Sequence, residues 1–174
     1  MPEYHRGAVH HTGASTPLIR PASARDVESI VALERESFAH PGERFGPRRV
    51  RHLIENPRFL VLAAERDGNV IGWAGGFVHL RGEIPWGRVY AIAVDPHARG
   101  QRLGRRLMEQ IIDALIARGA RRIFLEVRAD NRAAVRLYEK LGFAECRRLP
   151  NYYGHGIAGV RMQRVIGPSP AASS

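Results

Sequence analysis

The chain of 174 residues contains one cysteine, Cys146, and so it cannot form an internal disulfide. A lone cysteine suits a reducing compartment, and no Cys/His/Asp constellation is evident around it, which predicts that Cys146 is a packing residue. No stretch approaches the ~18 apolar residues of a membrane span, and the N-terminus has no apolar run of signal-peptide length. These absences predict a cytoplasmic protein that has no membrane partner.

Lysine is almost missing as well, because 26 of the 27 basic residues are arginine and only Lys140 is lysine. The formal net charge of +10 suggests a nucleic-acid partner. However, the arginines are scattered over most of the chain, and a GC-rich genome produces this skew without selection for binding. RNA or ribosome association through a basic surface is therefore a secondary hypothesis, ranked below attraction for a polyanionic cofactor.

Motifs for metals and nucleotides are also absent from the sequence. The eight histidines, including the pair His10-His11, show no metal-ligand spacing beside cysteine or carboxylate partners, so no metal is expected. Residues 154–159 match the dinucleotide pattern GxGxxG, but only 15 residues follow, too few for a βαβ unit. No Walker A sequence is present.

The composition that remains is typical of one globular domain, with 44% hydrophobic and 25% charged residues. Residues 1–16 and the tail 167–174 are rich in small and polar residues and proline, which predicts disorder. One domain is predicted over residues 17–166, a length that can bury a core without metals or disulfides.

Hydrophobic periodicity predicts alternating strands and helices along this domain. In the first half the expected elements are a strand at 18–20, helices at 24–39 and 48–55, and strands at 59–65, 70–80 and 88–94. In the second half they are a helix at 102–118, a strand at 123–128, a helix at 131–141, and strands near 143–149 and 158–166. The sequence RDGN predicts a hairpin between the second and third strands. The alternation with short connections predicts an α/β fold with parallel pairing in the middle of a mixed sheet.

The segment VYAIAVDPHARGQRLGRRL predicts a strand that passes through a proline turn into a helix. Free N–H groups and the helix dipole make such a helix start an anion site, and Gly100 and Gly104 would let a phosphate approach closely. Positive charge is added by Arg99, Arg102, Arg105 and Arg106. An arginine-rich helix start on a solvated face gives the same pattern, so this segment alone leaves both interpretations open.

Two residues further along the chain are candidates for proton transfer. In the strand RIFLEVR, Ile123, Leu125 and Val127 share one face and leave Glu126 on the other. Burial of that carboxylate would suit a general base, although an exposed glutamate at a sheet edge is the more common alternative. Tyr138 lies on an apolar helix side, where tyrosine usually only packs, yet its phenol is a competent proton donor.

With these motifs the sequence resembles the GNAT superfamily of acyl-CoA-dependent N-acyltransferases over residues 18–166. The family motif Gln/Arg-x-x-Gly-x-Gly/Ala corresponds to residues 99–104, RGQRLG, with Arg102 where the family usually has glycine. The run LEVRADNRAAVRLYEKLGF, followed by NYY, is most similar to the ribosomal-protein alanine N-acetyltransferases, the RimI group. The resemblance implies a mostly antiparallel mixed sheet, splayed between two central parallel strands and flanked by helices.

The resemblance also implies roles for particular residues. Glu126 corresponds to the general base and Tyr138 to the general acid, and Asn131 corresponds to an asparagine that contacts the pantetheine region. Backbone groups that pair with pantetheine correspond to Ile92, Ala93 and Val94. The implied cofactor loop consists of Arg99, Gly100, Gln101, Arg102, Leu103, Gly104 and Arg105.

The implied reaction moves acetyl from acetyl-CoA to a primary amine in a ternary complex, with a protein N-terminal α-amine or a lysine as acceptor. The group's Glu-Asp-Ala after the tyrosine pair is replaced here by residues 157–159, IAG, in a region that shapes the acceptor site. A small-molecule amine, an aminoacyl-tRNA or a non-catalytic acetyl-CoA- or RNA-binding module therefore remain alternatives. A monomer and a dimer fit the sequence equally well.

Overall fold

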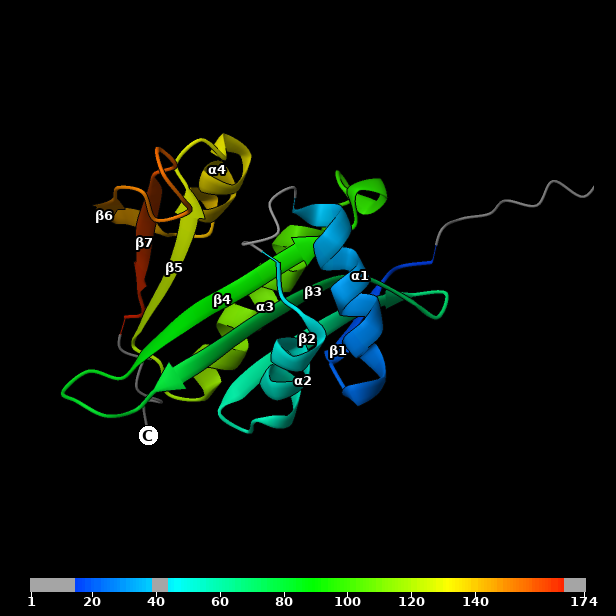
Figure 1. The fold of residues 1–174 in the computed structure, drawn as a ribbon. Helices are drawn as coiled ribbons and strands as arrows, with labels where there is room; N and C mark the ends of the chain where they lie inside the picture. Colours follow the sequence, from blue (N-terminus) through cyan, green and yellow to red (C-terminus); the bar gives the residue numbers. More distant parts are fainter. Residues whose placement is uncertain (1–14, 39–43, 168–174) are drawn as a thin grey trace, which may run out of the picture.

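A computed structural model describes residues 15–38 and 44–167. These residues form one seven-stranded sheet with helices on both sides (Figure 1). The spatial order of the strands is β1-β2-β3-β4-β5-β7-β6. The predicted disorder of residues 1–16 and 167–174 falls almost entirely outside the described residues. No helix in the part of the chain that the structure describes is long and apolar enough to cross a membrane.

The described elements agree with the predicted ones to within about two residues at most ends. The strands are β1 (Leu18–Pro21), β2 (Phe59–Arg66), β3 (Asn69–His79), β4 (Trp86–Val94), β5 (Arg122–Arg128), β6 (Ala144–Leu149) and β7 (Gly159–Val165). The helices are η1 (Ala24–Asp26), α1 (Val27–Ser37), α2 (Pro47–Glu55), η3 (Pro96–Ala98), α3 (Leu103–Ala117) and α4 (Arg132–Lys140). The predicted hairpin is confirmed, since Asp67 and Gly68 both have positive φ, 52° and 81°, between β2 and β3.

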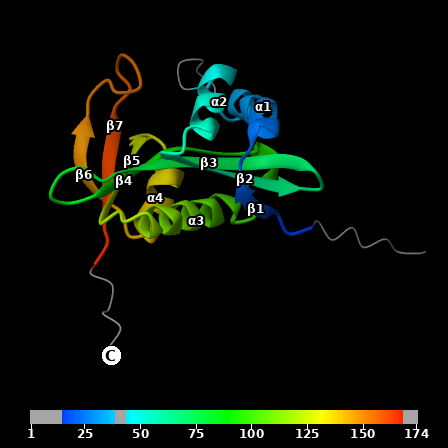
Figure 2. The same ribbon diagram turned by 90° about the horizontal axis from the view of Figure 1, so that it is seen from below.

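The sheet is mixed, as predicted. Each described pair of neighbouring strands is antiparallel except β4 and β5, which run parallel. Helices α1 and α2 cover one face of the sheet and α3 and α4 the other, as seen from below in Figure 2. The predicted α/β fold with a central parallel pair is therefore confirmed.

Each face of the sheet has its own apolar core. Leu107, Ile111 and Leu115 of α3 are fully buried against the sheet, together with Ile123 of β5. On the other face, residues of α1 and α2 pack around Trp73, which is also fully buried. The two helix layers thus hold the sheet rigidly while leaving the junction between β4 and β5 to define the site.

The β4–β5 junction opens after a few residues. The two strands pair only at Trp86↔Arg122, Gly87↔Ile123 and Arg88↔Phe124. A bulge at Tyr90 follows, since Gly75 pairs with Ala91 whereas Gly76 pairs with Val89. A bulge bends its strand and increases its twist. From Val89 onward, the edge of β4 that faces β5 therefore has no strand partner in the described part of the chain, and Figure 1 shows the two strands diverging.

A buried ion-pair cluster joins the start of α1 to the sheet. Arg20 on β1 contacts both carboxylate oxygens of Asp26 at 2.8 Å and also pairs with Glu65 of β2. Asp26 also accepts a bond from the N–H of Ser23 at 2.7 Å. The hydrogen bond from Arg20 is the largest of the effects that lower the pKa of Asp26 to about 2.

Asp26→Asn is expected to lower the free energy of unfolding at pH 7 by about 1–2 kcal/mol, allowing for solvent screening. A lowered pKa in the folded state means that the contribution is complete above the ordinary value of 3.8 and is lost as pH falls through 2. Urea unfolding from pH 7 to pH 3 should therefore show the difference between wild type and variant roughly halving by pH 3. A constant difference across that range would contradict this assignment.

Candidate active site

Glu126 lies in the interior of the sheet, on the β5 face opposite the buried Ile123, Leu125 and Val127. Its side chain is 5% exposed. The alternative of an exposed glutamate at a sheet edge is therefore wrong, because β7 covers the outer side of β5. A carboxylate with so little exposed surface requires hydrogen-bond or ion-pair partners.

Two arginines supply these partners. Arg88 of β4 places Nε and Nη2 2.8 and 2.7 Å from Oε2 of Glu126, and Arg161 of β7 places Nε 2.8 Å from Oε1. Arg161 is directly opposite Glu126 in the β5–β7 register. A carboxylate offers about four lone-pair positions, so one position on Oε1 remains for another donor. Sequence reasoning missed both arginines, because only strand pairing brings them to Glu126.

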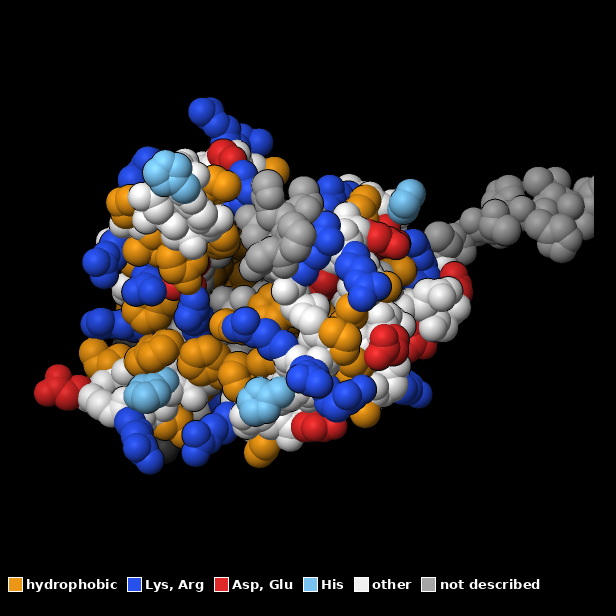
Figure 3. All heavy atoms as spheres, viewed as in Figure 1, with side chains coloured by type: hydrophobic (Ala, Val, Ile, Leu, Met, Phe, Trp, Pro, Cys, Tyr) orange, Lys and Arg blue, Asp and Glu red, His pale blue; other side chains and the backbone are white. Residues whose placement is uncertain are grey.

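The carboxylate lies in a pocket of about 190 Å³ whose remaining lining residues are Trp86, Arg88, Phe124 and Arg161. The rings of Trp86 and Phe124 are 6.0 Å apart, edge to face. Arg88 also donates a hydrogen bond of 3.0 Å to the hydroxyl of Tyr152. Figure 3 shows apolar and basic side chains beside each other over this part of the sheet. The pocket thus combines the charged groups of one carboxylate and two arginines with two aromatic side chains.

Tyr138 lies on the opposite face of the sheet, in the core formed with α3. It is 7% exposed, and its ring lies 6.3 Å from that of Phe143, edge to face. Burial raises the pKa of Tyr138 to about 12, so the hydroxyl keeps its proton at neutral pH. The described residues provide no hydrogen-bond partner for this hydroxyl. The ring of Tyr138 therefore packs in the core, while its O–H group remains available to donate a hydrogen bond.

The predicted base and acid thus occupy opposite faces of one sheet. Glu126 is on the face of α1 and α2, whereas Tyr138 is on the face of α3 and α4. Since β4 and β5 separate after Arg88, the sheet is open beside Glu126, and Tyr138 belongs to the core that also holds Leu125 and Val127 of β5. An amine arriving on one face and a thioester arriving on the other could meet at this opening.

The start of α3 has the geometry of an anion site. Gly100 has φ 80°, and Arg102, the N-cap residue, has φ 59° and makes no side-chain cap. No acceptor among the described residues takes the backbone N–H groups of Leu103, Gly104 and Arg105. The left-handed backbone at Arg102 explains why glycine is usual there in the family.

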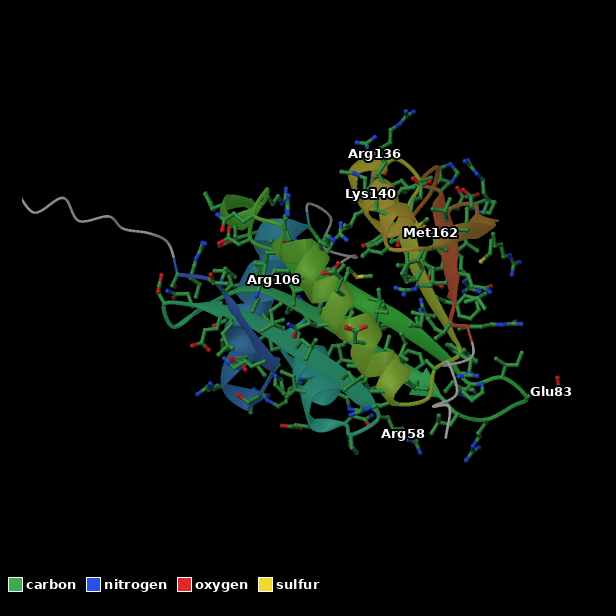
Figure 4. All side chains as sticks on the ribbon, turned by 180° about the vertical axis from the view of Figure 1, so that it is seen from behind. Arg58, Glu83, Arg106, Arg136, Lys140 and Met162 are labelled. Carbon is green, nitrogen blue, oxygen red and sulfur yellow. The ribbon has the colours of Figure 1, made fainter. Side chains whose placement is uncertain are left out.

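Two of the four arginines near the start of α3 make contacts within the protein. Arg105 pairs with Glu109 at 2.8 Å, and Arg106 donates to the carbonyl of Pro17 at 3.0 Å. Figure 4 shows Arg106 on α3, seen from behind. Arg99 and Arg102 are exposed and pair with no described carboxylate, so these two retain their charge for a ligand. Gln101 is held by Arg66, which donates to its Oε1 at 2.7 Å.

The other predicted cofactor residues lie on β4 and at the start of α4. Ile92, Ala93 and Val94 pair with β3 on one side only, opposite Ala74, Trp73 and Gly72. Asn131 caps α4, because its Oδ1 accepts a bond from the N–H of Ala134 at 3.1 Å. This cap leaves the side-chain NH₂ of Asn131 without a partner among the described residues.

Glu34 is a second buried carboxylate that the sequence did not single out. It is fully buried on α1 and accepts bonds from the indole N–H of Trp73 at 2.9 Å and from the N–H of Phe45 at 3.0 Å. Burial is the main cause that raises the pKa of Glu34. The carboxylate therefore ties α1 to Phe45, two residues before α2, on the same face of the sheet as Glu126.

Three other expectations concern residues outside the pocket. Cys146 is exposed in the edge strand β6, at the residue that bulges out of the register with β7, so its prediction as a packing residue was wrong. No cluster of His, Cys, Asp or Glu in the described ranges could hold a metal ion, and His10-His11 lie outside those ranges. The GxGxxG match at 154–159 covers the end of the connection between β6 and β7 and the first residue of β7, Gly159.

The split parallel pair and the uncapped helix start beside it define an acyl-CoA-dependent N-acyltransferase, the class that the sequence resemblance predicted. The chain belongs to the acetyltransferase (GNAT) family, whose model matches residues 27–143. It is an acetyl-CoA-dependent N-acetyltransferase.

Individual relatives are similar over different shares of the chain. A Bacillus subtilis (strain 168) protein with the provisional name [ribosomal protein bS18]-alanine N-acetyltransferase is 30% identical over 135 residues, 78% of this chain and 85% of that protein. The Escherichia coli (strain K12) [ribosomal protein bS18]-alanine N-acetyltransferase is 52% identical over 65 residues, 37% of this chain and 44% of that one. The crystal structure of the Escherichia coli ribosomal-protein-S18-alanine N-acetyltransferase matches with a TM-score of 0.75 and 27% identity, covering 91% of this chain and 99% of that one.

Proposed function

We propose that this enzyme transfers acetyl from acetyl-CoA to the α-amine at the N-terminus of a protein. The similarity to alanine N-acetyltransferases supports this acceptor. Alanine has no side-chain nitrogen, so the amine acetylated on an alanine residue is the α-amine of a chain terminus. An α-amine has a reference pKa near 8 against about 10.4 for lysine, and it therefore supplies the neutral nucleophile more readily at neutral pH.

In this proposal the pyrophosphate of acetyl-CoA binds at the start of α3. The free N–H groups of Leu103 and Gly104 donate to the phosphates, and the helix dipole adds to the attraction. Arg99 and Arg102 contribute charge. The pantetheine arm then runs along the unpaired edge of β4 at residues 92–94, with Asn131 on the other side of the opening, and a backbone N–H near Val94 stabilises the oxyanion.

Glu126 takes the proton of the acceptor amine. Because Arg88 and Arg161 occupy three of its lone-pair positions, the amine or one bridging water uses the position left on Oε1. The neutral amine attacks the thioester carbonyl, the C–N bond forms, and the C–S bond breaks. The first proton of the ammonium thus ends on Glu126 or its water, and the second proton, which the nitrogen loses after the C–N bond forms, passes to solvent.

Tyr138 donates its hydroxyl proton toward the departing sulfur. A thiolate has a reference pKa near 8.5, well below the pKa of about 12 of this buried phenol. Tyr138 therefore acts first as a hydrogen-bond donor to the developing thiolate, and full transfer yields free CoA only as a proton returns to the phenol from solvent.

The lone exposed thiol of Cys146, which has no disulfide partner in the chain, fits a cytoplasmic location.

The placement of Glu126 and Tyr138 on opposite faces of the opening carries this proposal. It is tested by measuring CoA release with peptides that begin with alanine or serine, with the same peptides blocked at the N-terminus, and with a blocked peptide that contains an internal lysine. Release that depends on a free N-terminus supports the proposal. Equal release from the blocked lysine peptide, or release with small amines alone, would overturn it.

Arg102→Gly is expected to change acetyl-CoA affinity by less than tenfold. Glycine relieves the left-handed backbone at this position, where a non-glycine residue costs roughly 1–2 kcal/mol, while the N–H donors of the loop remain. Isothermal titration of both forms at two ionic strengths measures this, with Arg99→Ala as the comparison for loss of a free guanidinium. A larger fall in affinity, together with a steep salt dependence of wild-type binding, would assign Arg102 an essential phosphate contact.

A further inference from the structure

We propose that the preferred acceptor of this enzyme carries an acidic side chain within its first three residues, bound by Arg49, Arg88 and Arg161. This inference rests on the proposed function, since it concerns the peptide that follows the acetylated amine. It starts from the charge balance of the acceptor pocket, which is positive although the incoming amine is itself a cation in water.

The charge balance follows from the contacts of Glu126. This carboxylate, the only one among the described residues that line the pocket, faces the two guanidinium groups of Arg88 and Arg161. One negative charge against two positive charges leaves the pocket with a net charge of +1. A ligand that brought only an ammonium group would therefore enter against a positive field, and a ligand with a nearby carboxylate would not.

Arg49 of α2 adds a third guanidinium on the same side of the sheet. Its Cζ lies 4.9 Å from the ring centre of Phe45 and 5.2 Å from that of Tyr90. Arg88 lies 5.5 Å from the same Tyr90 ring. Arg49 is exposed and pairs with no described carboxylate. Tyr90 thus holds one paired and one unpaired guanidinium close to the pocket, and the cluster reaches a net charge of +2.

Contacts with neighbouring groups hold these arginine side chains in place, and this affects how strongly they bind a carboxylate. Exposed ion pairs contribute little because solvent screens them and long side chains lose freedom on pairing. Here the rings of Phe45 and Tyr90 contact Arg49, Tyr90 also contacts Arg88, and Glu126 holds Arg88 and Arg161 before a ligand binds. Preorganised guanidinium groups beside apolar walls make stronger, charge-assisted bonds to a carboxylate.

The length of a peptide limits where the acidic residue can be. Each extended residue spans at most about 3.6 Å, so a side chain in one of the first three residues stays near an amine that reaches Glu126. A lysine or arginine at the same place would add a cation to a cluster that already carries a net charge of +2. The cluster should therefore select for acidic residues and against basic ones.

The test compares peptides of equal length, Ala-Xaa-Xaa followed by a common neutral sequence, with Asp, Asn or Lys at the second and third positions. The quantity measured is kcat/KM for CoA release at saturating acetyl-CoA. We expect the Asp peptide to exceed the Asn peptide by about tenfold and the Lys peptide to be the poorest. Raising the salt concentration to 0.5 M should reduce the advantage of Asp and leave the Asn peptide nearly unchanged.

Charge-reversal variants test which arginine causes the preference for the Asp peptide. Arg49→Glu should remove most of the preference for Asp and raise the rate with the Lys peptide. Arg51→Glu is the matched control, because it makes the same change in net charge at another exposed position of α2, where the arginine contacts no ring of the described residues. Arg51→Glu should retain the wild-type order of the three peptides. Thermal melts verify that both variants fold.

The outcomes separate the two proposals. Equal kcat/KM for Asp and Asn peptides, or the same loss of preference in both charge-reversal variants, would overturn the acidic acceptor and leave N-terminal acetylation standing. Release with none of the peptides, while acetyl-CoA still binds, would overturn the proposed function itself.

Discussion

Replacing Glu126 by Gln is expected to lower kcat/KM for CoA release by roughly 10²–10⁴, the usual range for loss of a general base. Glutamine keeps the shape of the side chain and one acceptor oxygen but cannot take a proton from the acceptor amine. The loss should be greatest at low pH, where less of the amine is already neutral, and should narrow as pH approaches the pKa of the amine. Rates with an N-terminal peptide from pH 6 to pH 10 measure this.

The controls for Glu126→Gln distinguish chemistry from structure. The substitution leaves Arg88 and Arg161 without their carboxylate, so unfolding and acetyl-CoA binding are measured with the same preparation. Glu145→Gln is the matched variant, since it removes an exposed glutamate that pairs with Arg148 at 3.3 Å on β6, and it should leave the rate unchanged. A folded Glu126→Gln enzyme with near-wild-type rates across this pH range would exclude Glu126 as the base.

Tyr138→Phe is expected to lower kcat/KM by a similar factor of roughly 10²–10⁴. Only a hydroxyl is removed from a well-packed ring, so acetyl-CoA affinity should change little. The hydroxyl has no protein partner among the described residues, and its loss should therefore not lower the stability. A variant with an unchanged Tm, unchanged acetyl-CoA affinity and a large rate loss would match a proton donor.

The alternative for Tyr138 is that it only packs against the α3 core. In that case Tyr138→Phe would change activity by less than threefold, because phenylalanine fills the same volume. Rapid-quench measurement of acetylated peptide under single-turnover conditions makes the comparison free of product dissociation. A rate loss that disappears in single turnover would assign the residue to product release and would contradict its proposed role as acid.

Local patterns were sufficient to predict most of the fold. The apolar periodicity of α3 and the alternation in β5 depend on which face each residue presents, and these faces were read from residue spacing alone. The pair Asp67-Gly68 likewise predicted its hairpin from turn chemistry. Helix and strand ends differed by a residue or two, since capping depends on contacts made only after folding.

The candidate site was only half visible in the sequence. Glu126 and Tyr138 were found because each stands in a run that resembles a known family. Arg161 was not found, since it is 35 residues away and reaches Glu126 through the β5–β7 register. Cys146 was misjudged for the same kind of reason: burial of a strand residue depends on whether its strand lies at the edge of the sheet.

The sequence by itself determined the order of elements, the faces of α3 and β5 and the family, because these follow from nearest-neighbour patterning. The tertiary structure decided the electrostatics. The pairing of β4 with β5 ends after only three residues, and with the bulge at Tyr90 this separates the two strands. The order of the strands in the sheet brings Arg88 and Arg161 to one carboxylate. These are contacts between distant residues, and their charges act through space rather than along the chain, so no local pattern encodes them.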